Sequence, residues 1–271
     1  MEITLTASDG YHLGAASYGS SGKRVLIMPA TGVPQSYYAK FASYLAVRGF
    51  SVLTFDYRGI GRSKNGDLRK MDARMRDWAL LDAAAAFRHL ASGVLVVGHS
   101  FGGQALGLVP EVERLRGALL VGSQSGYWRN WSPFGRLWMW PTTHFALDGA
   151  TRLFGYFPGS RLGFGEDLPP GVAKEWAAWC RHPTYLVGAL GVEETYAKLR
   201  APIRAYAISD DAFAPLPAVE ALARLYPNAR WETRQLAPRE LGVGSIGHFG
   251  FFRERFRDSL WREAADWLER Q

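Results

Sequence analysis

The chain has 271 residues, of which 48% are hydrophobic and 21% charged, a balance that excludes a disordered or collagen-like protein. The formal net charge is +7, but the basic residues are scattered and interrupted by acids, so we do not expect nucleic-acid binding. The length is compatible with one large domain that carries an insertion or with two small domains.

Cysteine usage and the N-terminus bear on location. Cys180 is the single cysteine, which excludes an internal disulfide and a thiolate zinc cluster. Residues 1–6 have neither a basic segment nor a long apolar one, and no apolar run approaches the roughly 18 residues of a membrane span. We therefore expect a cytoplasmic protein without a membrane span, whose oligomeric state stays open.

The apolar pattern predicts eight strands. Residues 3–6 and 12–18 alternate around the turn pair Asp9-Gly10, as in a hairpin. The following runs are apolar without alternation, as in strands that are buried on both faces. They are residues 25–28, 52–55, 94–97, 118–121 and 203–208, with a last strand at 231–236.

Helical spacing of apolar residues lies between these runs. It occurs at residues 37–45, 78–89 and 106–109, and again at 253–270 near the C-terminus. Strands that alternate with helices predict an α/β fold with a mostly parallel sheet and helices on both faces.

The alternation stops between about residues 122 and 199. Residues 127–182 hold 13 aromatics in 56 positions, about 23% against 14% overall, with weak periodicity. We therefore predict one α/β core, formed by residues 1–124 and 200–271, with an aromatic-rich cap at 125–199 after the sixth strand.

One short motif points to chemistry. Gly98-His99-Ser100-Phe101-Gly102 matches G-x-S-x-G, the nucleophile elbow, in which the glycines permit a tight turn that lifts the serine hydroxyl above a sheet. The motif follows a predicted strand and precedes a helical segment, as this turn requires. Ser100 is therefore the candidate nucleophile.

A serine nucleophile needs a base and an acid that orients the base. His248 is the one histidine after the last predicted strand, and glycines on both sides indicate a loop. Asp210 and Asp211 follow strand 203–208, at the edge where open parallel sheets build their sites. The order serine, acid, histidine is the order that G-x-S-x-G hydrolases require.

Several motifs together resemble the α/β-hydrolase family, specifically esterase-like and lipase-like serine hydrolases with a cap after the sixth strand. They are residues 29–32 (PATG), 55–63 (FDYRGIGRS), 98–102, 209–215 and 247–249. The family's acid usually stands four residues before a proline, as Asp211 does relative to Pro215. The resemblance therefore favours Asp211 as the acid, with Asp210 bracing the loop.

The resemblance also implies an oxyanion hole made of backbone N–H groups. One belongs to Phe101, and the other comes from the loop after the third strand. Many members have His-Gly where this chain has Pro29-Ala30, so Thr31 is expected to donate, with Ala30 as the alternative.

Other residues have weaker assignments. Candidate substrate contacts are Ala30, His99, Trp128, Trp138, His144 and Phe249. Strand geometry nevertheless favours a structural role for His99, and packing is the better expectation for His144, for His182 and for most cap aromatics. We expect Asp56 and Arg58 to form a structural pair after the fourth strand, and no metal site, because His12 and His89 lack suitable partners.

These features predict hydrolysis of a small to medium carboxylic ester with apolar groups, through an acyl-enzyme and without a cofactor. The same triad can serve a thioesterase, a C–C bond hydrolase, an acyltransferase or an aminopeptidase. A peptidase needs acids for a free amine, and Glu166-Asp167 and Glu193-Glu194 are weak candidates. A non-catalytic ligand receptor on this fold is the alternative outside enzymes.

Overall fold

The computed structural model describes residues 1–91 and 93–271. Its centre is an eight-stranded sheet in the order β1-β2-β4-β3-β5-β6-β7-β8, in which β2 runs antiparallel to both neighbours and the remaining pairs are parallel. The strands are β1 (Glu2–Thr6), β2 (His12–Tyr18), β3 (Arg24–Met28), β4 (Ser51–Phe55), β5 (Val94–His99), β6 (Leu115–Val121), β7 (Pro202–Ile208) and β8 (Arg230–Leu236). All eight predicted strands are found, so the predicted α/β fold with a mostly parallel sheet is confirmed.

The helices are mostly short. They are α1 (Ala39–Val47), α2 (Met75–Asp77), α3 (Ala84–His89), α4 (Phe101–Gln104), α5 (Pro133–Pro141), α6 (Leu147–Phe154), α7 (Gly159–Leu162), α8 (Pro170–Arg181), α9 (Tyr185–Leu190), α10 (Glu193–Ala197), α11 (Leu216–Ala223), α12 (Gly247–Gly250) and α13 (Arg262–Glu269). π-helical turns precede α3, α6 and α13. Among the described residues, no helix is both long and apolar enough to cross a membrane.

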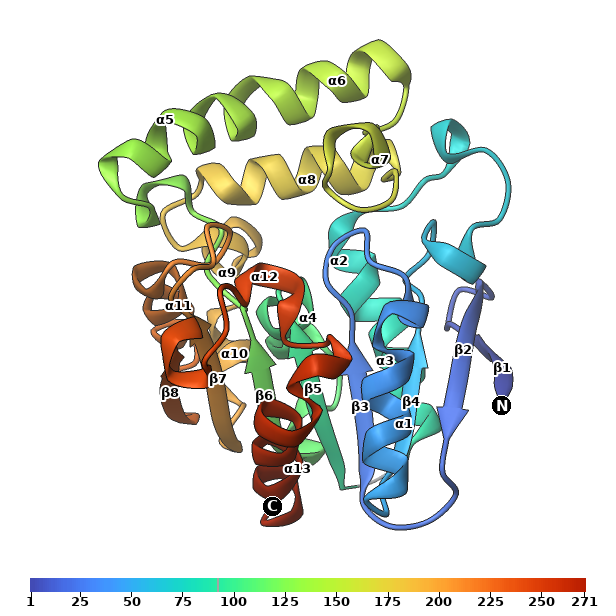
Figure 1. Ribbon diagram of the computed structural model, residues 1–271. Coiled ribbons are helices and arrows are strands. Elements are labelled where there is room, and N and C mark those ends of the chain that lie inside the picture. The colour runs from blue at the N-terminus through green and yellow to red at the C-terminus, as the bar shows by residue number, and fades with distance from the viewer. Residues whose placement is uncertain (92) are drawn as a thin grey trace.

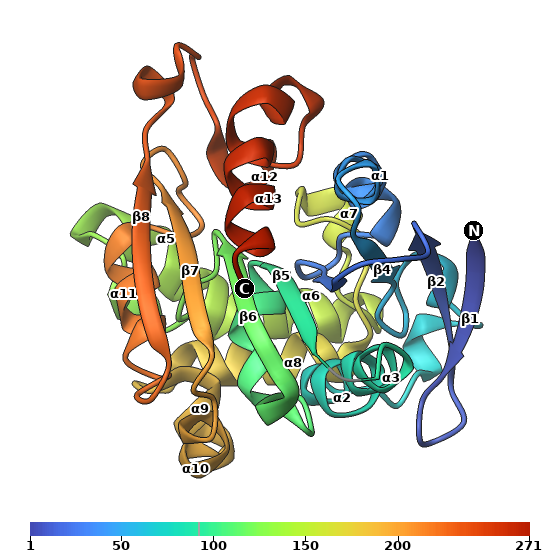
Figure 2. The same ribbon diagram turned by 90° about the horizontal axis from the view of Figure 1, so that it is seen from below.

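The sheet separates two apolar clusters. Along β3, Val25 and Ile27 pack into one cluster while Leu26 and Met28 pack into the other, because successive strand residues point to opposite faces. Helices α1 and α13 cover one face, and α2 and α3 cover the other, as Figure 2 shows from below. Helix α4 packs into the same cluster as α2 and α3. The unbroken apolar runs of the central strands are thus explained by burial on both sides.

The segment between β6 and β7 holds helices α5 to α10. Helix α5, the π-helical turn Thr142–Ala146 and α6 form one long helix that lies above the sheet, with α8 beneath it (Figure 1). Helices α9 and α10, which the domain prediction placed in the cap, return alongside the core, where Tyr196 donates to the carbonyl of Gln104 at 2.6 Å.

The expected pairing of Asp56 with Arg58 is wrong. Asp56 instead accepts hydrogen bonds from the backbone N–H groups of Gln35, at 2.6 Å, and Arg62, at 3.0 Å. Arg58 pairs with another carboxylate, and its guanidinium lies 2.7 Å from Asp82. Asp82 is fully buried in an alanine-rich helical segment, and burial raises its pKa to about 6 although Arg58 opposes the shift. Both carboxylates are buried and both have partners: Asp56 accepts from backbone N–H groups of the neighbouring loops, and Asp82 is paired with the Arg58 cation.

Candidate active site

Ser100 lies in a strained turn at the carboxyl end of β5. Its φ of 50° and ψ of −112° are costly for a residue with a side chain. The glycines around it permit close backbone approach. A Cβ on Gly102 would overlap the carbonyl of Met28, and one on Gly98 would lie 2.7 Å from the backbone nitrogen of Gly103. The turn therefore fixes the serine at the edge of the sheet.

His248 and Asp211 form a buried pair beside this turn. The Nδ1 of His248, in α12, lies 2.7 Å from Oδ2 of Asp211, which follows β7. The two residues are 8% and 4% exposed. A carboxylate on Nδ1 holds the imidazole so that its other nitrogen, Nε2, is free to accept a proton.

The two neighbouring aspartates have different partners. Oδ1 of Asp211 accepts hydrogen bonds from the N–H groups of Phe213, at 2.8 Å, and Ala214, at 3.0 Å, which leaves Oδ2 for the imidazole. Asp210 instead accepts from the N–H groups of Ile246 and Gly247, the residues just before His248. The geometry thus pairs Asp211 with the histidine and makes Asp210 a brace of its loop.

The nucleophile elbow adjoins His248, but the serine hydroxyl and the imidazole, both of which the structure describes, are not hydrogen-bonded to each other. Among the described residues, no hydrogen bond joins Oγ of Ser100 to the His248 ring, a contact that often tightens only when substrate binds. The N–H of Ser100 donates to the carbonyl of Val121 at 3.0 Å. The next residue, Gly122, lies so close to the pair that a Cβ there would be 3.1 Å from Nδ1 of His248. Sequence reasoning missed Gly122, although a glycine directly after a buried strand is a visible signal.

A chain of buried hydrogen bonds links His248 to the loop after β3. Nε2 of His99 lies 3.0 Å from the carbonyl of His248, and its Nδ1 lies 2.8 Å from the Tyr38 hydroxyl. Burial lowers the pKa of His99 well below its usual value, so the ring is neutral. A carbonyl can only accept, so Nε2 carries the proton and Nδ1 accepts from Tyr38. The same hydroxyl accepts from the N–H of Ala30 at 2.9 Å.

These hydrogen bonds decide which backbone N–H groups are left as candidate oxyanion donors. The N–H of Ala30 is taken by Tyr38, whereas the N–H groups of Thr31 and Phe101 have no acceptor among the described residues. The geometry therefore favours Thr31 over Ala30 as the second donor. The role of Tyr38 was not visible in the sequence, because a tyrosine in an amphipathic helix normally indicates core packing.

A segment of the cap is hydrogen-bonded to the loop after β3, which carries Thr31. The N–H of Glu166 donates to the carbonyl of Gly32 at 2.7 Å, and its carboxylate accepts from the N–H of Gly61 at 3.0 Å. This carboxylate therefore has a structural partner and does not point to an amine subsite. Glu193 and Glu194, the other acids considered for that role, are exposed on α10.

A small cavity of about 50 Å³ lies between the cap and the core. Its wall includes Phe213, whose ring centroid lies 5.4 Å from that of His248. The wall is mainly aromatic and aliphatic, with two glutamines: Gln104, Gln124, Gly126, Trp131, Trp138, Met139, Thr142, Thr143, Leu147, Phe164, Trp176, Cys180 and Phe213. Nε2 of Gln124 donates to the carbonyl of Phe213 at 3.0 Å and so holds the loop that carries the acid. The space fits only one or two water-sized groups.

The predicted substrate contacts separate into three groups. Trp138 lines the cavity, and the ring of Phe249 lies 5.0 Å from that of His248. Trp128 and His144 pack on each other, 5.9 Å apart, and are not in the cavity wall. Ala30 and His99 are 3% and 0% exposed. For His99 this corrects the assignment as a substrate contact, because both of its ring nitrogens already have protein partners.

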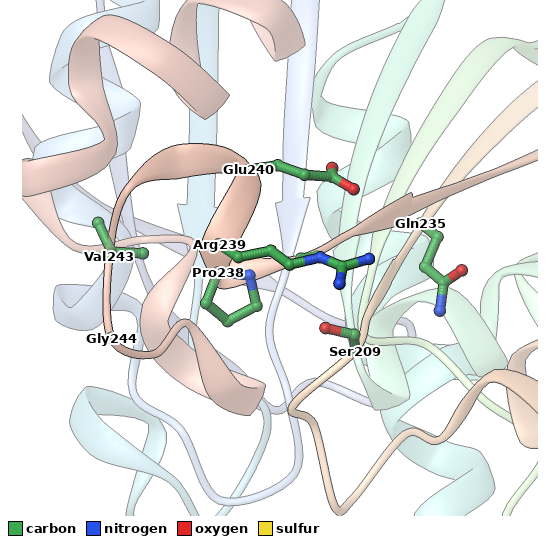
Figure 3. A pocket seen from close by; sticks show the side chains of 8 residues that line it. Ser209, Gln235, Pro238, Arg239, Glu240, Val243 and Gly244 are labelled. Carbon is green, nitrogen blue, oxygen red and sulfur yellow. The ribbon is translucent and has the colours of Figure 1, made fainter.

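Larger hollows open elsewhere. One of about 500 Å³ lies at the ends of β7 and β8, where Arg239 extends between Glu240 and Ser209 toward Gln235 (Figure 3). Another of about 550 Å³ is lined by Arg129, Arg136 and Arg224 and shares Trp131 and Trp138 with the small cavity. None of the three walls, that of the small cavity included, contains Ser100, Asp211 or His248, so size alone does not identify the site. The small cavity is the one whose wall includes a residue, Phe213, that packs on His248.

Solved structures share this fold at low sequence identity. An esterase from Thermogutta terrifontis, described with malate bound, is 19% identical over 100% of this chain and 98% of its own, with a TM-score of 0.66. An esterase from Exiguobacterium antarcticum is 16% identical over 99% and 100%, with a TM-score of 0.67. An N-formylmaleamic acid deformylase from Pseudomonas putida is 18% identical over 95% and 98%, with a TM-score of 0.61. At these identities the likeness shows the fold alone.

Among curated proteins, no sequence matches this chain. A family model described as "Alpha/beta hydrolase family" matches residues 25–262, which include the elbow, both aspartates and His248. Because the match covers most of the sequence, the chain belongs to the alpha/beta hydrolase family.

Proposed function

We propose that the chain is a serine hydrolase that cleaves carboxylic esters of small to medium size through an acyl-enzyme. The observation that carries this proposal is the 2.7 Å contact between His248 Nδ1 and Asp211 Oδ2, next to a serine in a strained turn. Such an arrangement costs stability and has a clear use in nucleophilic catalysis.

In the first half-reaction, Ser100 Oγ attacks the ester carbonyl while Nε2 of His248 takes the hydroxyl proton. The carbonyl oxygen becomes an oxyanion, which the N–H groups of Phe101 and Thr31 stabilise. Asp211 stabilises the imidazolium. The tetrahedral intermediate then collapses, the C–O bond to the alcohol breaks, and His248 gives its proton to the leaving alkoxide.

In the second half-reaction, His248 takes a proton from water as the water oxygen attacks the acyl carbon. The second tetrahedral intermediate releases the carboxylic acid, and the proton returns to Oγ of Ser100. Each proton that leaves Oγ or water therefore passes through Nε2. No cofactor is required by this sequence of steps.

The cavity wall supports an apolar group on the substrate. Phe213 packs on His248, and Trp138 and Phe164 pack on Phe213, so the wall offers continuous aromatic surface up to the histidine. The glutamine amides bond to protein groups. At about 50 Å³ the cavity must expand before an acyl chain enters, either by side-chain rotation or by movement of the cap. The leaving group is not selected by the triad, so thioesters belong in the substrate screen.

The proposal is tested with a fluorophosphonate probe followed by peptide mass spectrometry. We expect one adduct, on Ser100, that is lost in His248→Ala and retained in Asp210→Asn. A smaller organophosphate, diethyl p-nitrophenyl phosphate, is run in parallel so that a closed cap does not mask a reactive serine. Modified protein is then compared with free protein on p-nitrophenyl esters of increasing chain length.

Two results would contradict the proposal. An adduct on another serine would move the nucleophile. No adduct with either probe on folded protein, together with saturable ligand binding, would favour a non-catalytic receptor.

A further inference from the structure

The exposed apolar side chains are concentrated on the cap. Ten large apolar residues are exposed among the described residues, and seven of them lie within residues 134–162. The other three, Met1, Val47 and Leu80, are isolated on the core. Scattered exposed apolar residues are ordinary, but a contiguous group indicates a surface that is covered in use.

The long helix at residues 133–154 has two distinct faces. Buried residues recur every fourth position, at Met139, Thr143, Leu147 and Thr151. This face lies toward α8, because Met139, Thr143 and Leu147 share a cavity wall with Trp176 and Cys180 of that helix. The opposite face, which we call the outer face, repeats at every third or fourth position. It consists of Phe134, Leu137, Pro141, Phe145, Gly149 and Leu153.

The outer face is apolar and largely exposed to solvent. Leu137, Phe145 and Leu153 are 73%, 60% and 77% exposed. Figure 1 shows this helix at the end of the molecule opposite both chain termini, with no other element above it. The face belongs to one helix with no second element beside it at the top of the molecule, so it suits contact with a plane better than contact with a peptide.

The charges beside this face have one sign. Arg136 and Arg152 are exposed on the helix, and Arg161 follows, with its guanidinium 5.8 Å from the Phe154 ring centroid. Asp148 is the single acid in residues 133–165 and is paired with Arg181 at 3.2 Å. A second copy of the chain docked face to face would bring arginines together without acids, whereas phosphate groups would complement them.

We propose that the outer face binds an anionic lipid surface, with its apolar side chains in the boundary between head groups and acyl chains. Such helices lie in the plane of the interface and combine a broad apolar face with flanking basic residues. At about 1.5 Å per residue, 22 helical residues give a contact about 33 Å long. This inference does not depend on ester hydrolysis.

Vesicle flotation tests the proposal with the full chain. We expect the protein to float with vesicles of phosphatidylcholine and phosphatidylglycerol, more weakly with phosphatidylcholine alone, and less as salt rises. The combined variant Leu137→Ser, Phe145→Ser and Leu153→Ser should bind at least tenfold more weakly. Arg152→Gln should weaken only the anionic preference, by about fivefold.

Val47→Ser is the matched control, because Val47 is 79% exposed on the core and far from the cap helix. Its vesicle binding should equal that of the parent chain. A second readout uses labelling, since Cys180 is buried and a surface cysteine can be modified alone. A polarity-sensitive dye on Leu153→Cys should shift to the blue on vesicles, and one on Val47→Cys should not.

Three results would overturn the proposal. The first is that the parent chain does not float with vesicles. The second is that the triple variant floats as well as the parent while its circular dichroism spectrum is unchanged. The third is that light scattering finds the parent chain as a dimer and the triple variant as a monomer. The last result would assign the outer face to self-association. We expect the triple variant to turn over a soluble ester as fast as the parent chain. This measurement separates a failure of vesicle binding from a failure of the proposed hydrolysis.

Discussion

The core buries polar side chains that are hydrogen-bonded, whereas the cap exposes apolar side chains to solvent. In the core, buried polar groups at the site have defined partners, such as Asp211 with two N–H groups and an imidazole. In the cap, Leu137 and Phe145 are largely exposed although they are apolar. The hydrogen bonds of the core therefore hold the catalytic candidates in place, while the cap offers apolar surface for contacts. We expect changes in the core to act on rate and changes in the cap to act on binding.

The largest effect should follow loss of the nucleophile or the base. Ser100→Ala and His248→Ala should each lower kcat by about 10⁴ to 10⁶. Their unfolding transitions in urea should stay close to that of the parent. Steady-state kinetics on a p-nitrophenyl ester measures this, and near-full activity in either variant would refute the triad.

The adjacent aspartates should differ sharply. Asp211→Asn should lower kcat by about 10³ to 10⁴, because the amide no longer stabilises the imidazolium or selects its tautomer. Asp210→Asn, the matched control, should cost less than tenfold, since it weakens only the brace of the His248 loop. The reverse ranking would assign the acid to Asp210.

The buried hydroxyl of Tyr38 should matter less but measurably. Tyr38→Phe leaves the N–H of Ala30 and Nδ1 of His99 without partners, so we expect kcat to fall about tenfold with little change in KM, and stability to fall by about 1–3 kcal/mol. Tyr44→Phe removes a half-buried hydroxyl from α1, the helix that directly follows Tyr38, and should leave kcat unchanged. Equal kcat values in the two variants would show that the hydrogen-bond chain does not position the site.

A cap substitution should show the opposite kinetic split. Trp138→Ala removes aromatic surface from the cavity wall, so KM should rise about tenfold while kcat changes little. Trp140→Ala, two residues away and outside that wall, should leave both constants unchanged. A fall in kcat without a change in KM would place Trp138 in the catalytic machinery.

The smallest effect concerns pH. His99 stays neutral in the folded protein, because burial lowers its pKa, whereas it binds a proton near pH 6.5 when unfolded. Protons therefore favour the unfolded chain, and stability should fall as pH drops below about 6.5, by up to about 1.4 kcal/mol per pH unit. His99→Gln should remove this slope in urea titrations, and an unchanged slope would refute the neutral assignment.

Periodicity and motif order predicted most of the core correctly. The central strands were visible as apolar runs, and the elbow, Asp211 and His248 could be placed in chain order at one edge of the sheet. Long-range polar pairing was not visible. The pairing of Arg58 with Asp82 spans 24 residues, and nothing local marks it, so the sequence suggested the nearer Asp56 instead.

The cap shows a different kind of failure. Its aromatics could be counted, but their directions depend on how a long helix with a π-helical turn sits on α8, which composition does not encode. Trp138 reaches the cavity while Trp128 packs on His144. Tyr38 was hidden for a related reason, because its hydroxyl finds partners on two other segments.

The two hydrogen bonds that Glu166 makes to Gly32 and Gly61 have a consequence for the order of substrate entry and catalysis. Glu166, in the segment between β6 and β7, bonds to the carbonyl of Gly32, which directly follows Thr31, the proposed second oxyanion donor. Lifting this segment to admit substrate would release the loop that carries the second oxyanion donor, and closing it would set that loop again. Entry and full catalytic competence would then alternate, so that a reactive site forms only when bulk solvent has been shut out.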